Sequence, residues 1–213
     1  MVLADLGFAS NQMEDPVRGF SFSREGPLDM RLATSGAGAS SETLPPSAAD
    51  LVASLPEPEL IRILREYGEE RRAGAIARKI AAARRTHPIS TTTELASIVR
   101  SAIGRADPGG IDPATRTFQA LRIAVNDELG NLDALLHAVR GAMATPARPD
   151  WLAPGARVGV ISFHSLEDRP VKRMFAGLVQ SGVAEDVTDG SPTPTEDEVS
   201  RNPRSRSAKL RVV

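Results

Sequence analysis

Two apolar segments of the sequence are each followed directly by polar side chains that can do chemistry. Residues 1–8 carry Asp5 near their end, and residues 157–163 are followed by His164 and Ser165. Continuous apolar runs of this kind are typical of strands that are buried on both faces of a parallel sheet. Ligands of open α/β sheets bind where the carboxyl ends of the strands meet. We therefore expect the loops after both segments to border one crevice.

The run His164, Ser165 and Asp168 also suggests a serine hydrolase. Triad members are normally brought together by the fold rather than by adjacency in the chain, and no Gly-x-Ser-x-Gly elbow is present. We therefore expect His164 and Ser165 to line the crevice beside the Asp5 loop. Asp168 is expected to cap the chain locally or to pair with Arg169.

Composition excludes several classes of site. The 213 residues contain no cysteine, so disulfides, thiol nucleophiles, iron–sulfur clusters and Cys-ligated zinc are ruled out, and we expect no metal. Aromatic residues make up 4% of the chain, which argues against an aromatic platform for stacked bases. No apolar run approaches the roughly 20 residues of a membrane span, and no signal peptide is visible. These features predict a cytoplasmic protein without a membrane partner.

The loop between Arg18 and Arg31 is a candidate nucleic-acid contact. It carries three arginines, which can bind phosphate bidentately, and the side chains of Phe20 and Phe22, which can stack on an extruded base. The alternative is a structural loop whose phenylalanines fill the core. The sequence leaves both open.

Basic residues gather in two further places. Residues 201–213 carry five bases and no acid, directly after an acidic block over 185–198; this pattern is typical of an extended interaction segment. Arg204, Arg206 and Lys209 are its candidate RNA contacts. Arg116, between two threonines at the start of a helical pattern, is a second candidate anion site, with simple capping by Thr115 as the alternative.

Helical patterns fill most of the middle of the chain. Apolar spacing predicts helices over 48–55, over 57–85 with a break near Gly68 or Gly74, over 114–142 as the longest, and over 168–180. A Thr91-x-x-Glu94 capping box predicts another helix that begins there. Residues 33–48 resemble a flexible connector. Two strands alone do not make a stable sheet, so the sequence is interpreted as the second half of a doubly wound α/β domain with a helical insertion.

Several motifs resemble those of one family. They occur in its order and cover most of the chain: Asp5-Leu-Gly-Phe-Ala-Ser-Asn-Gln12, Asp15-Pro-x-Arg18-Gly, Gly26-Pro-Leu-Asp-Met-Arg31, Pro113-Ala-Thr-Arg-Thr-Phe-Gln-Ala-Leu-Arg-Ile123, Val160-Ile-Ser-Phe-His-Ser-Leu-Glu-Asp-Arg169 and Asn202-Pro-Arg-Ser-Arg-Ser-Ala-Lys-Leu-Arg211. On these motifs the chain resembles the bacterial small-subunit (16S) ribosomal RNA cytosine-N(4) methyltransferases of the MraW type.

The resemblance implies a Rossmann-like methyltransferase core, S-adenosylmethionine as cofactor and one cytidine of the small ribosomal subunit as methyl acceptor. It assigns residues 1–29 and 114–213 to part of the core and 30–113 to a helical insertion for substrate recognition. Asp5 and Gln12 match cofactor-contacting positions of the family. Asp5 and His164 are the candidate catalytic residues.

The sequence departs from the family pattern in one important respect. Members carry a glycine-rich cofactor loop ahead of the Asp-Leu-Gly strand, and no Gly-x-Gly-x-x-Gly occurs in this chain. We therefore expect a fragment, or the product of a downstream start, that binds S-adenosylmethionine weakly. Smaller departures are Asn11, Asp112 and Pro170. Two alternatives stay open: a remnant that only binds RNA or the ribosome, and a truncated product without stable function.

Overall fold

The computed structural model describes residues 1–33, 44–104, 111–144, 151–188 and 191–213. It is a mixed α/β fold in two compact units. Residues 1–7 and 128–213 form the sheet unit, and residues 8–127 form the helical unit. Most of the expected connector over 33–48 lies outside the described residues.

The sheet unit is built on three strands in the order β1 (Val2–Asp5), β2 (Val158–Ser162) and β3 (Lys209–Val212). β1 and β2 are parallel, with Asp5 opposite Ile161, and β3 runs antiparallel to β2. The parallel pairing predicted for the two apolar segments is thus present. The third strand comes from the basic segment that the sequence analysis took for an extended tail.

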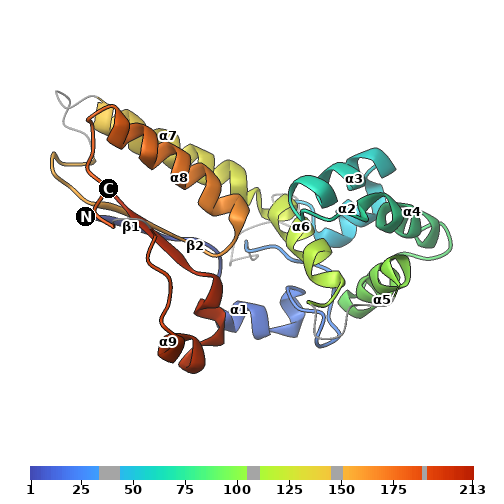
Figure 1. The fold of residues 1–213 in the computed structure, drawn as a ribbon. Coiled ribbons are helices and arrows are strands. Elements are labelled where there is room, and N and C mark those ends of the chain that lie inside the picture. Colours follow the sequence, from blue (N-terminus) through green and yellow to red (C-terminus); the bar gives the residue numbers. More distant parts are fainter. Residues whose placement is uncertain (34–43, 105–110, 145–150, 189–190) are drawn as a thin grey trace. The chain divides into compact units, whose positions relative to one another are not determined.

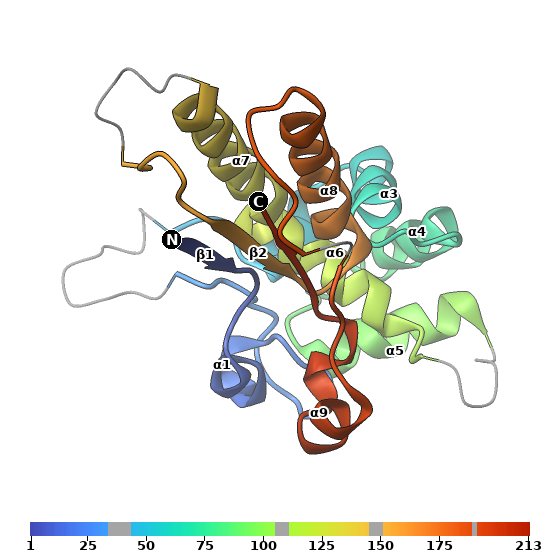
Figure 2. The ribbon, with the colours of Figure 1, turned by 60° about the vertical axis from the view of Figure 1, so that its left-hand side comes forward.

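Two helices cover one face of this sheet, α7 (Glu128–Ala144) and α8 (Ser165–Gln180), and Figures 1 and 2 show them side by side above the strands. The two helices share an apolar core with the strands, which includes Leu136, Phe175 and Val160. Burial of this apolar surface is the main force that holds helices and sheet together.

β1 differs from the expected strand with two buried faces. It lies at an edge of the described sheet, and its burial alternates: Val2 and Ala4 are half-buried and pack against the shared core, whereas Leu3 is 54% exposed. Leu3 lies on the other face of the sheet, where its side chain approaches the backbone of Gly159. The apolar run in the sequence therefore indicated a strand correctly but overstated its burial.

The predicted helix over 114–142 is two helices, α6 (Ala114–Asn126) and α7. The break is at Asp127, whose φ of 47° is left-handed and ends α6. Just before it, the Asn126 amide accepts a hydrogen bond from Leu32 N–H (2.7 Å) and donates to the Met30 carbonyl (2.8 Å). Apolar spacing runs through this position, so periodicity alone did not reveal the break.

The helical unit contains α1 (Ser10–Glu14), a short 3₁₀ helix (Pro16–Arg18), α2 (Ala48–Ser54), α3 (Glu57–Glu66), α4 (Ala73–Ala83), α5 (Thr92–Ile103) and α6. The predicted break in the 57–85 pattern is confirmed, because α3 and α4 are separate helices. Gly68 lies in the break, and a Cβ there would be 2.7 Å from the Arg116 carbonyl oxygen. The predicted start of α5 is also confirmed, since Thr91 Oγ1 accepts from Glu94 N–H (3.3 Å).

Residues 9–31 form a compact loop structure rather than an open loop. Gly19, with φ of 70°, lies so close to the backbone of Pro27 that a Cβ would be 2.2 Å from its carbonyl oxygen. Thr92 at the start of α5 ties the loop to that helix by accepting from Gly26 N–H (3.2 Å) and donating to the Arg24 carbonyl (3.1 Å). A side chain at position 19 would therefore disrupt the loop.

The segment after α8 is ordered in its described part. It contains α9 (Glu196–Arg201), a 3₁₀ helix (Pro203–Ser207) and β3, and Val213 is buried in the core of the sheet unit. The prediction of an extended tail was therefore wrong for 203–213. Leu210, Val212 and Val213 provide enough apolar surface to add a strand, which the count of basic residues obscured.

The boundaries of the two units differ from the domain boundaries expected from the resemblance. Residues 8–29 and 114–127, expected in the methyltransferase core, belong to the helical unit. The assignment of 30–113 to substrate recognition stays a prediction. None of the helices in the described ranges has the length and apolar character needed to cross a membrane.

Candidate functional site at the carboxyl ends of β1 and β2

The carboxyl ends of β1 and β2 lie next to each other in the sheet unit. Leu6 N–H continues the parallel ladder past Asp5 by donating to the Ile161 carbonyl (3.1 Å). A Cβ on Gly7, where φ is 100°, would be 3.9 Å from the Phe163 ring, so the two trailing loops are neighbours. Both apolar strands thus bring their following residues to one edge of the sheet, as the parallel pairing requires, whereas the expected crevice between the loops stays a prediction. Asp5 is exposed there.

His164 follows β2 and directly precedes α8. Its imidazole is largely buried, with 16% of the side chain exposed, and Nε2 lies 3.2 Å from Glu167 Oε1. Neither ring nitrogen has a partner in hydrogen-bond geometry, so the short Nε2–Oε1 distance is a close approach without the required angles. The ring is therefore held by packing and by its close approach to Glu167, and neither nitrogen is engaged in a hydrogen bond.

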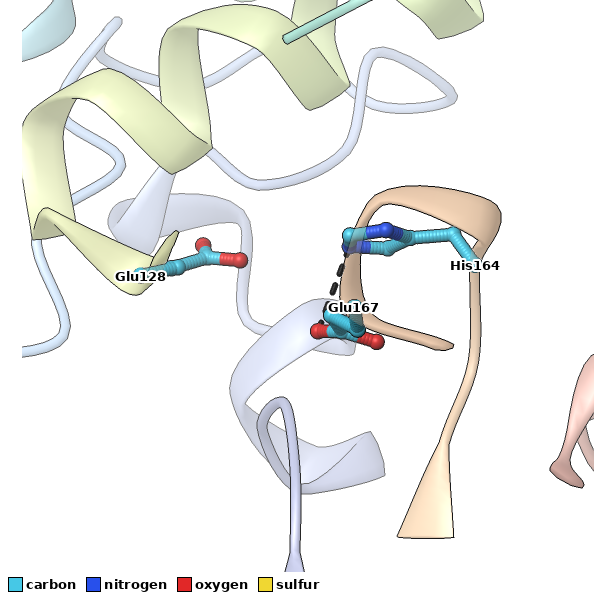
Figure 3. Close-up of side chains that lie close together, drawn as sticks. All are labelled: Glu128, His164 and Glu167. Carbon is cyan, nitrogen blue, oxygen red and sulfur yellow. Dashed lines mark ion pairs between the residues drawn. The ribbon is translucent and has the colours of Figure 1, made fainter. Parts of the chain in front are cut away.

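Two glutamates converge on this imidazole. Glu167, with 5% of its side chain exposed, accepts a hydrogen bond from Phe163 N–H (2.9 Å). Glu128 comes from the first turn of α7, and one ligand-type atom from each of Glu128, His164 and Glu167 lies within 4.8 Å of the others. Figure 3 shows the three side chains pointing toward one another from the starts of α7 and α8. The group combines two carboxylates with one imidazole in a mostly buried place.

Asp168 has a structural partner on β3, and its expected pairing with Arg169 stays a prediction. Its carboxylate accepts from Arg211 Nε (2.7 Å) and lies 3.4 Å from Lys209 Nζ. The Arg211 hydrogen bond is the largest influence on the pKa of Asp168, and together with the charges of Arg211 and Lys209 it outweighs burial and holds that pKa below its usual range. Because Asp168 is ionised and engaged, it contributes to the packing of α8 on β3. A serine triad through Asp168 has no support here.

Gln12 lies in the helical unit, whereas Asp5 lies in the sheet unit. Gln12 is the third residue of α1, and its Oε1 accepts a hydrogen bond from Ala9 N–H (3.0 Å). This contact caps the start of the helix, which is a sufficient structural reason for a glutamine at the position. Its expected contact with a cofactor stays a prediction.

Two of the three arginines of the 18–31 loop are used inside the helical unit. Arg18 donates to the Leu32 carbonyl (2.7 Å), and Arg31 makes a two-point contact with Asp29 (Nε–Oδ1 2.9 Å and Nη2–Oδ2 2.5 Å). Burial acts to raise the pKa of Asp29, but the hydrogen bonds and charge of Arg31 lower it overall. Both guanidinium groups therefore hold loop segments together, and RNA binding by them stays a prediction.

Phe20 fills the core, which is the alternative that the sequence left open. The ring is 6% exposed and stacks on Phe8 with centroids 4.8 Å apart. Phe22 packs edge-on against Phe118 at 4.7 Å. Both rings thus have partners within the helical unit, and stacking of Phe20 on a base would require it to leave the core.

Arg116 is exposed in the first turn of α6, as a phosphate contact requires, and its Nη1 donates weakly to the Glu69 carbonyl (3.4 Å). The capping alternative is filled by another residue. Asp112 Oδ1, rather than Thr115, accepts from the Ala114 N–H (2.8 Å) at the helix start. Arg100 pairs with the same carboxylate (2.8 Å), and its hydrogen bond is the main cause that lowers the pKa of Asp112.

The three basic candidates near the C-terminus differ in surroundings. Arg204 and Arg206 lie on the 3₁₀ helix and are exposed, whereas Lys209 is half-buried beside Asp168. Lys209 therefore has a structural contact with Asp168. RNA binding by all three side chains stays a prediction, and exposure favours Arg204 and Arg206.

Glu128 is a residue that the sequence analysis missed. It lies in the middle of a continuous apolar pattern, where an acidic residue suggests only an exposed helix position. Nothing in its local sequence connects it with His164, which is far along the chain; the packing of α7 beside α8 brings the two together. Glu167 enters the sequence analysis only as part of the motif that ends at Arg169.

Comparison with known proteins agrees with the motifs. The family model described as the MraW methylase family matches residues 1–213. Among curated proteins, the chain is 50% identical over 214 residues to ribosomal RNA small subunit methyltransferase H of Deinococcus radiodurans, covering 99% of this chain and 61% of that protein. It is 48% identical over 228 residues to the protein of the same name from Methylobacterium sp. (strain 4-46), covering 99% of this chain and 62% of the relative.

The protein of the same name from Granulibacter bethesdensis is 47% identical over 229 residues, which cover 100% of this chain and 63% of the relative. The chain thus spans about three fifths of the length of these relatives. Since the family model covers every residue of the sequence, the chain belongs to the MraW methylase family.

Proposed function

We propose that this chain is part of an S-adenosylmethionine-dependent methyltransferase that modifies N(4) of a cytidine in 16S ribosomal RNA. The family match over residues 1–213 carries the proposal, together with the names of relatives that act on small-subunit ribosomal RNA. The adjacent carboxyl ends of β1 and β2 support it, because ligands of Rossmann-like folds bind at such an edge. In this proposal the sheet unit belongs to a Rossmann-like core and the helical segment 30–113 recognises the RNA.

The residues at the edge fit a cofactor contact only in part. Asp5 offers an exposed carboxylate at the end of β1, which can accept hydrogen bonds from hydroxyl or amino groups of a ligand. Gly7 after it has a left-handed φ of 100°, which a residue with a side chain rarely adopts, and the Phe163 ring lies close by. The sequence supplies no Gly-x-Gly-x-x-Gly turn to cradle a nucleotide. We therefore assign Asp5 to the contact and expect low affinity in this chain.

S-adenosylmethionine supplies an electrophilic methyl group, and the protein's task is to align the acceptor amine with it. The amino nitrogen of cytosine is a weak nucleophile, because its lone pair is delocalised into the ring. Positioning is therefore the main contribution expected of the chain. Asp5 accepts a hydrogen bond from the cofactor or from the amino group of the base. His164, at the neighbouring strand end, lines the acceptor side.

The ribosomal RNA partner is proposed to lie against exposed basic side chains, namely Arg116 of the helical unit and Arg204 and Arg206 of the sheet unit. Phosphate contacts of this kind position the RNA without reading its sequence. The second candidate function is RNA or ribosome binding without methyl transfer. The specific observation that favours it is the exposure of these basic side chains, because phosphate contacts need no cofactor.

The test uses the full 213-residue chain, small ribosomal subunits whose 16S RNA lacks the modification, and methyl-labelled cofactor at up to millimolar concentration. We expect label in N(4)-methylcytidine, identified by nucleoside mass spectrometry. Asp5→Asn should lower the rate at least tenfold, with a raised KM for the cofactor if Asp5 binds it or a lowered kcat if Asp5 contacts the base. Asp15→Asn is the matched control, because Asp15 only caps the 3₁₀ helix start through Val17 N–H.

Two results would contradict the proposal. Label in another base would refute the cytidine assignment. Subunits retained by the chain in a salt-dependent manner without any label, even at millimolar cofactor, would favour the binding-only function. Micromolar affinity for S-adenosylmethionine in calorimetric titration would overturn the expectation of weak binding.

A further inference from the structure

The cluster of Glu128, His164 and Glu167 has the composition of a metal site. An imidazole nitrogen and carboxylate oxygens are the ligands of zinc and of similar divalent transition ions. The three donor atoms lie within 4.8 Å of one another, and the cluster is mostly buried. We propose that these three side chains bind one divalent transition-metal ion, with Zn²⁺ as the probe that best suits the donor set.

The first argument is geometric. Zinc–ligand bonds of about 2.1 Å separate two ligands of a tetrahedral site by about 3.4 Å. His164 Nε2 and Glu167 Oε1 are 3.2 Å apart, which is already near this spacing. Glu128, whose ligand atom lies within 4.8 Å of the other two, completes the set after a rotamer adjustment of its flexible side chain. Three protein ligands leave one position of a tetrahedral ion open for water or another ligand.

The second argument concerns hydrogen bonding. Both nitrogens of the His164 ring are inaccessible to solvent and without a hydrogen-bond partner in the described structure. Buried polar atoms are almost always satisfied, and each exception calls for an explanation. A metal ion on one nitrogen satisfies that atom directly. Figure 3 shows the ring aimed toward the two carboxylates, as such an ion requires.

The third argument is electrostatic. Favourable interaction with a helix dipole explains one carboxylate in the first turn of α7 and one in the first turn of α8. It does not explain why the two carboxylates converge on one imidazole. Two carboxylates and one imidazole together form a donor set that matches the charge of a divalent cation. The ion would then join the starts of the two helices that cover the sheet.

The test measures metal binding by the full chain without cofactor or RNA, so its outcome is independent of the proposed methyl transfer. After treatment with a chelator, the protein is titrated with ZnCl₂ by calorimetry. We expect one Zn²⁺ per chain with micromolar or tighter affinity, and a rise in Tm at saturating zinc. Mg²⁺, which prefers oxygen ligands in octahedral geometry, should bind at least tenfold more weakly.

His164→Asn and Glu128→Gln should each weaken zinc binding at least tenfold. His137→Asn is the matched control, since His137 lies beside Asp133 on the exposed side of α7 (57% and 71% exposed). Glu167→Gln keeps an oxygen for Phe163 N–H, and circular dichroism without metal establishes that each variant is folded. The visible absorption of Co²⁺ bound to the unmodified protein is a second measurement that needs no variant. Four-coordinate Co²⁺ absorbs visible light much more strongly than the six-coordinate ion in water.

Three outcomes would overturn the proposal. One is the absence of calorimetric heat and Co²⁺ absorption with the unmodified chain. The second is unchanged zinc affinity in folded His164→Asn and Glu128→Gln. The third is loss of binding in His137→Asn, which would assign the ion to the exposed surface of α7.

Discussion

The candidate site residues of the helical unit and those at the strand ends of the sheet unit differ in how far the fold engages them. In the helical unit, Arg18 and Arg31 satisfy backbone carbonyls and an internal carboxylate, and Phe20 lies in the core. In the sheet unit, the exposed Asp5 carboxylate and the His164 ring lie at the ends of strands. We infer that polar side chains just beyond the ends of strands, where backbone pairing stops, can contact a ligand. In the packed 18–31 loop, by contrast, Arg18 and Arg31 are already engaged in internal contacts.

The largest effect on stability is expected in the packed loop of residues 18–31. Gly19→Ala places a Cβ 2.2 Å from a backbone oxygen at a φ of 70°, so we expect a loss of about 4 kcal/mol in unfolding free energy. Urea unfolding followed by circular dichroism measures it. Gly182→Ala, just after the end of α8, is the control, since Gly182 has a φ of 72° but no described atom within 4 Å of an added Cβ. It should cost only about 1 kcal/mol. Equal effects would show that the loop is not packed as described.

The next effect concerns the buried ion pair of the sheet unit. Asp168→Asn leaves Arg211 without its charged partner, and both side chains are mostly buried (11% and 15% exposed), so we expect a loss of about 3 kcal/mol. Asp197→Asn on the exposed face of α9 should change stability little. If the two substitutions had equal effects, Asp168 would not be the contact that ties α8 to β3.

The same pair predicts a dependence of stability on pH. The pKa of Asp168 is lowered in the folded chain, so the carboxylate stabilises the fold at pH values above the usual aspartate pKa of about 3.9. This stabilisation should be lost as the pH falls below about 4 and through the native pKa. Asp168→Asn should therefore flatten the acid side of a stability profile measured between pH 2 and 7. An unchanged profile would contradict the assignment.

A smaller effect is expected for the ion pair inside the helical unit. Asp29→Asn removes the charge that Arg31 contacts at two points, and both side chains are about one quarter exposed, so we expect a loss of about 1 kcal/mol in urea unfolding. The comparison between the units would fail if this substitution left stability unchanged but weakened RNA binding. Arg31 would then serve the ligand rather than the loop.

The smallest effect on stability is expected for the exposed arginines near the C-terminus. Arg204→Ala and Arg206→Ala should each change the unfolding free energy by less than about 0.5 kcal/mol. The double variant should retain fewer small ribosomal subunits than the unmodified chain. Its binding should also depend less on salt concentration, as expected for lost phosphate contacts. Lys209→Ala is the comparison variant. We expect it to lower the unfolding free energy more, because it also removes the contact with Asp168.

The sequence determined the local elements with strong signals. The strands at 2–5 and 158–162, the capped start of α5 and the break between α3 and α4 follow from apolar runs, a threonine–glutamate pair and glycine. It also indicated that Asp5 and His164 follow neighbouring strands, because parallel strands place their carboxyl ends at one edge. The family followed from motifs rather than from periodicity.

Only the tertiary structure decided which polar groups are used internally. The left-handed Asp127 divides a pattern that looks continuous, because Asn126 is held by the backbone of residues 30–32. The basic end of the chain forms β3, because β2 offers it an unpaired edge and Asp168 offers it a countercharge. Glu128 meets His164 through helix packing, and no local pattern encodes a contact between residues so far apart in the chain. Local sequence sets propensity, whereas hydrogen-bond partners depend on which surfaces meet.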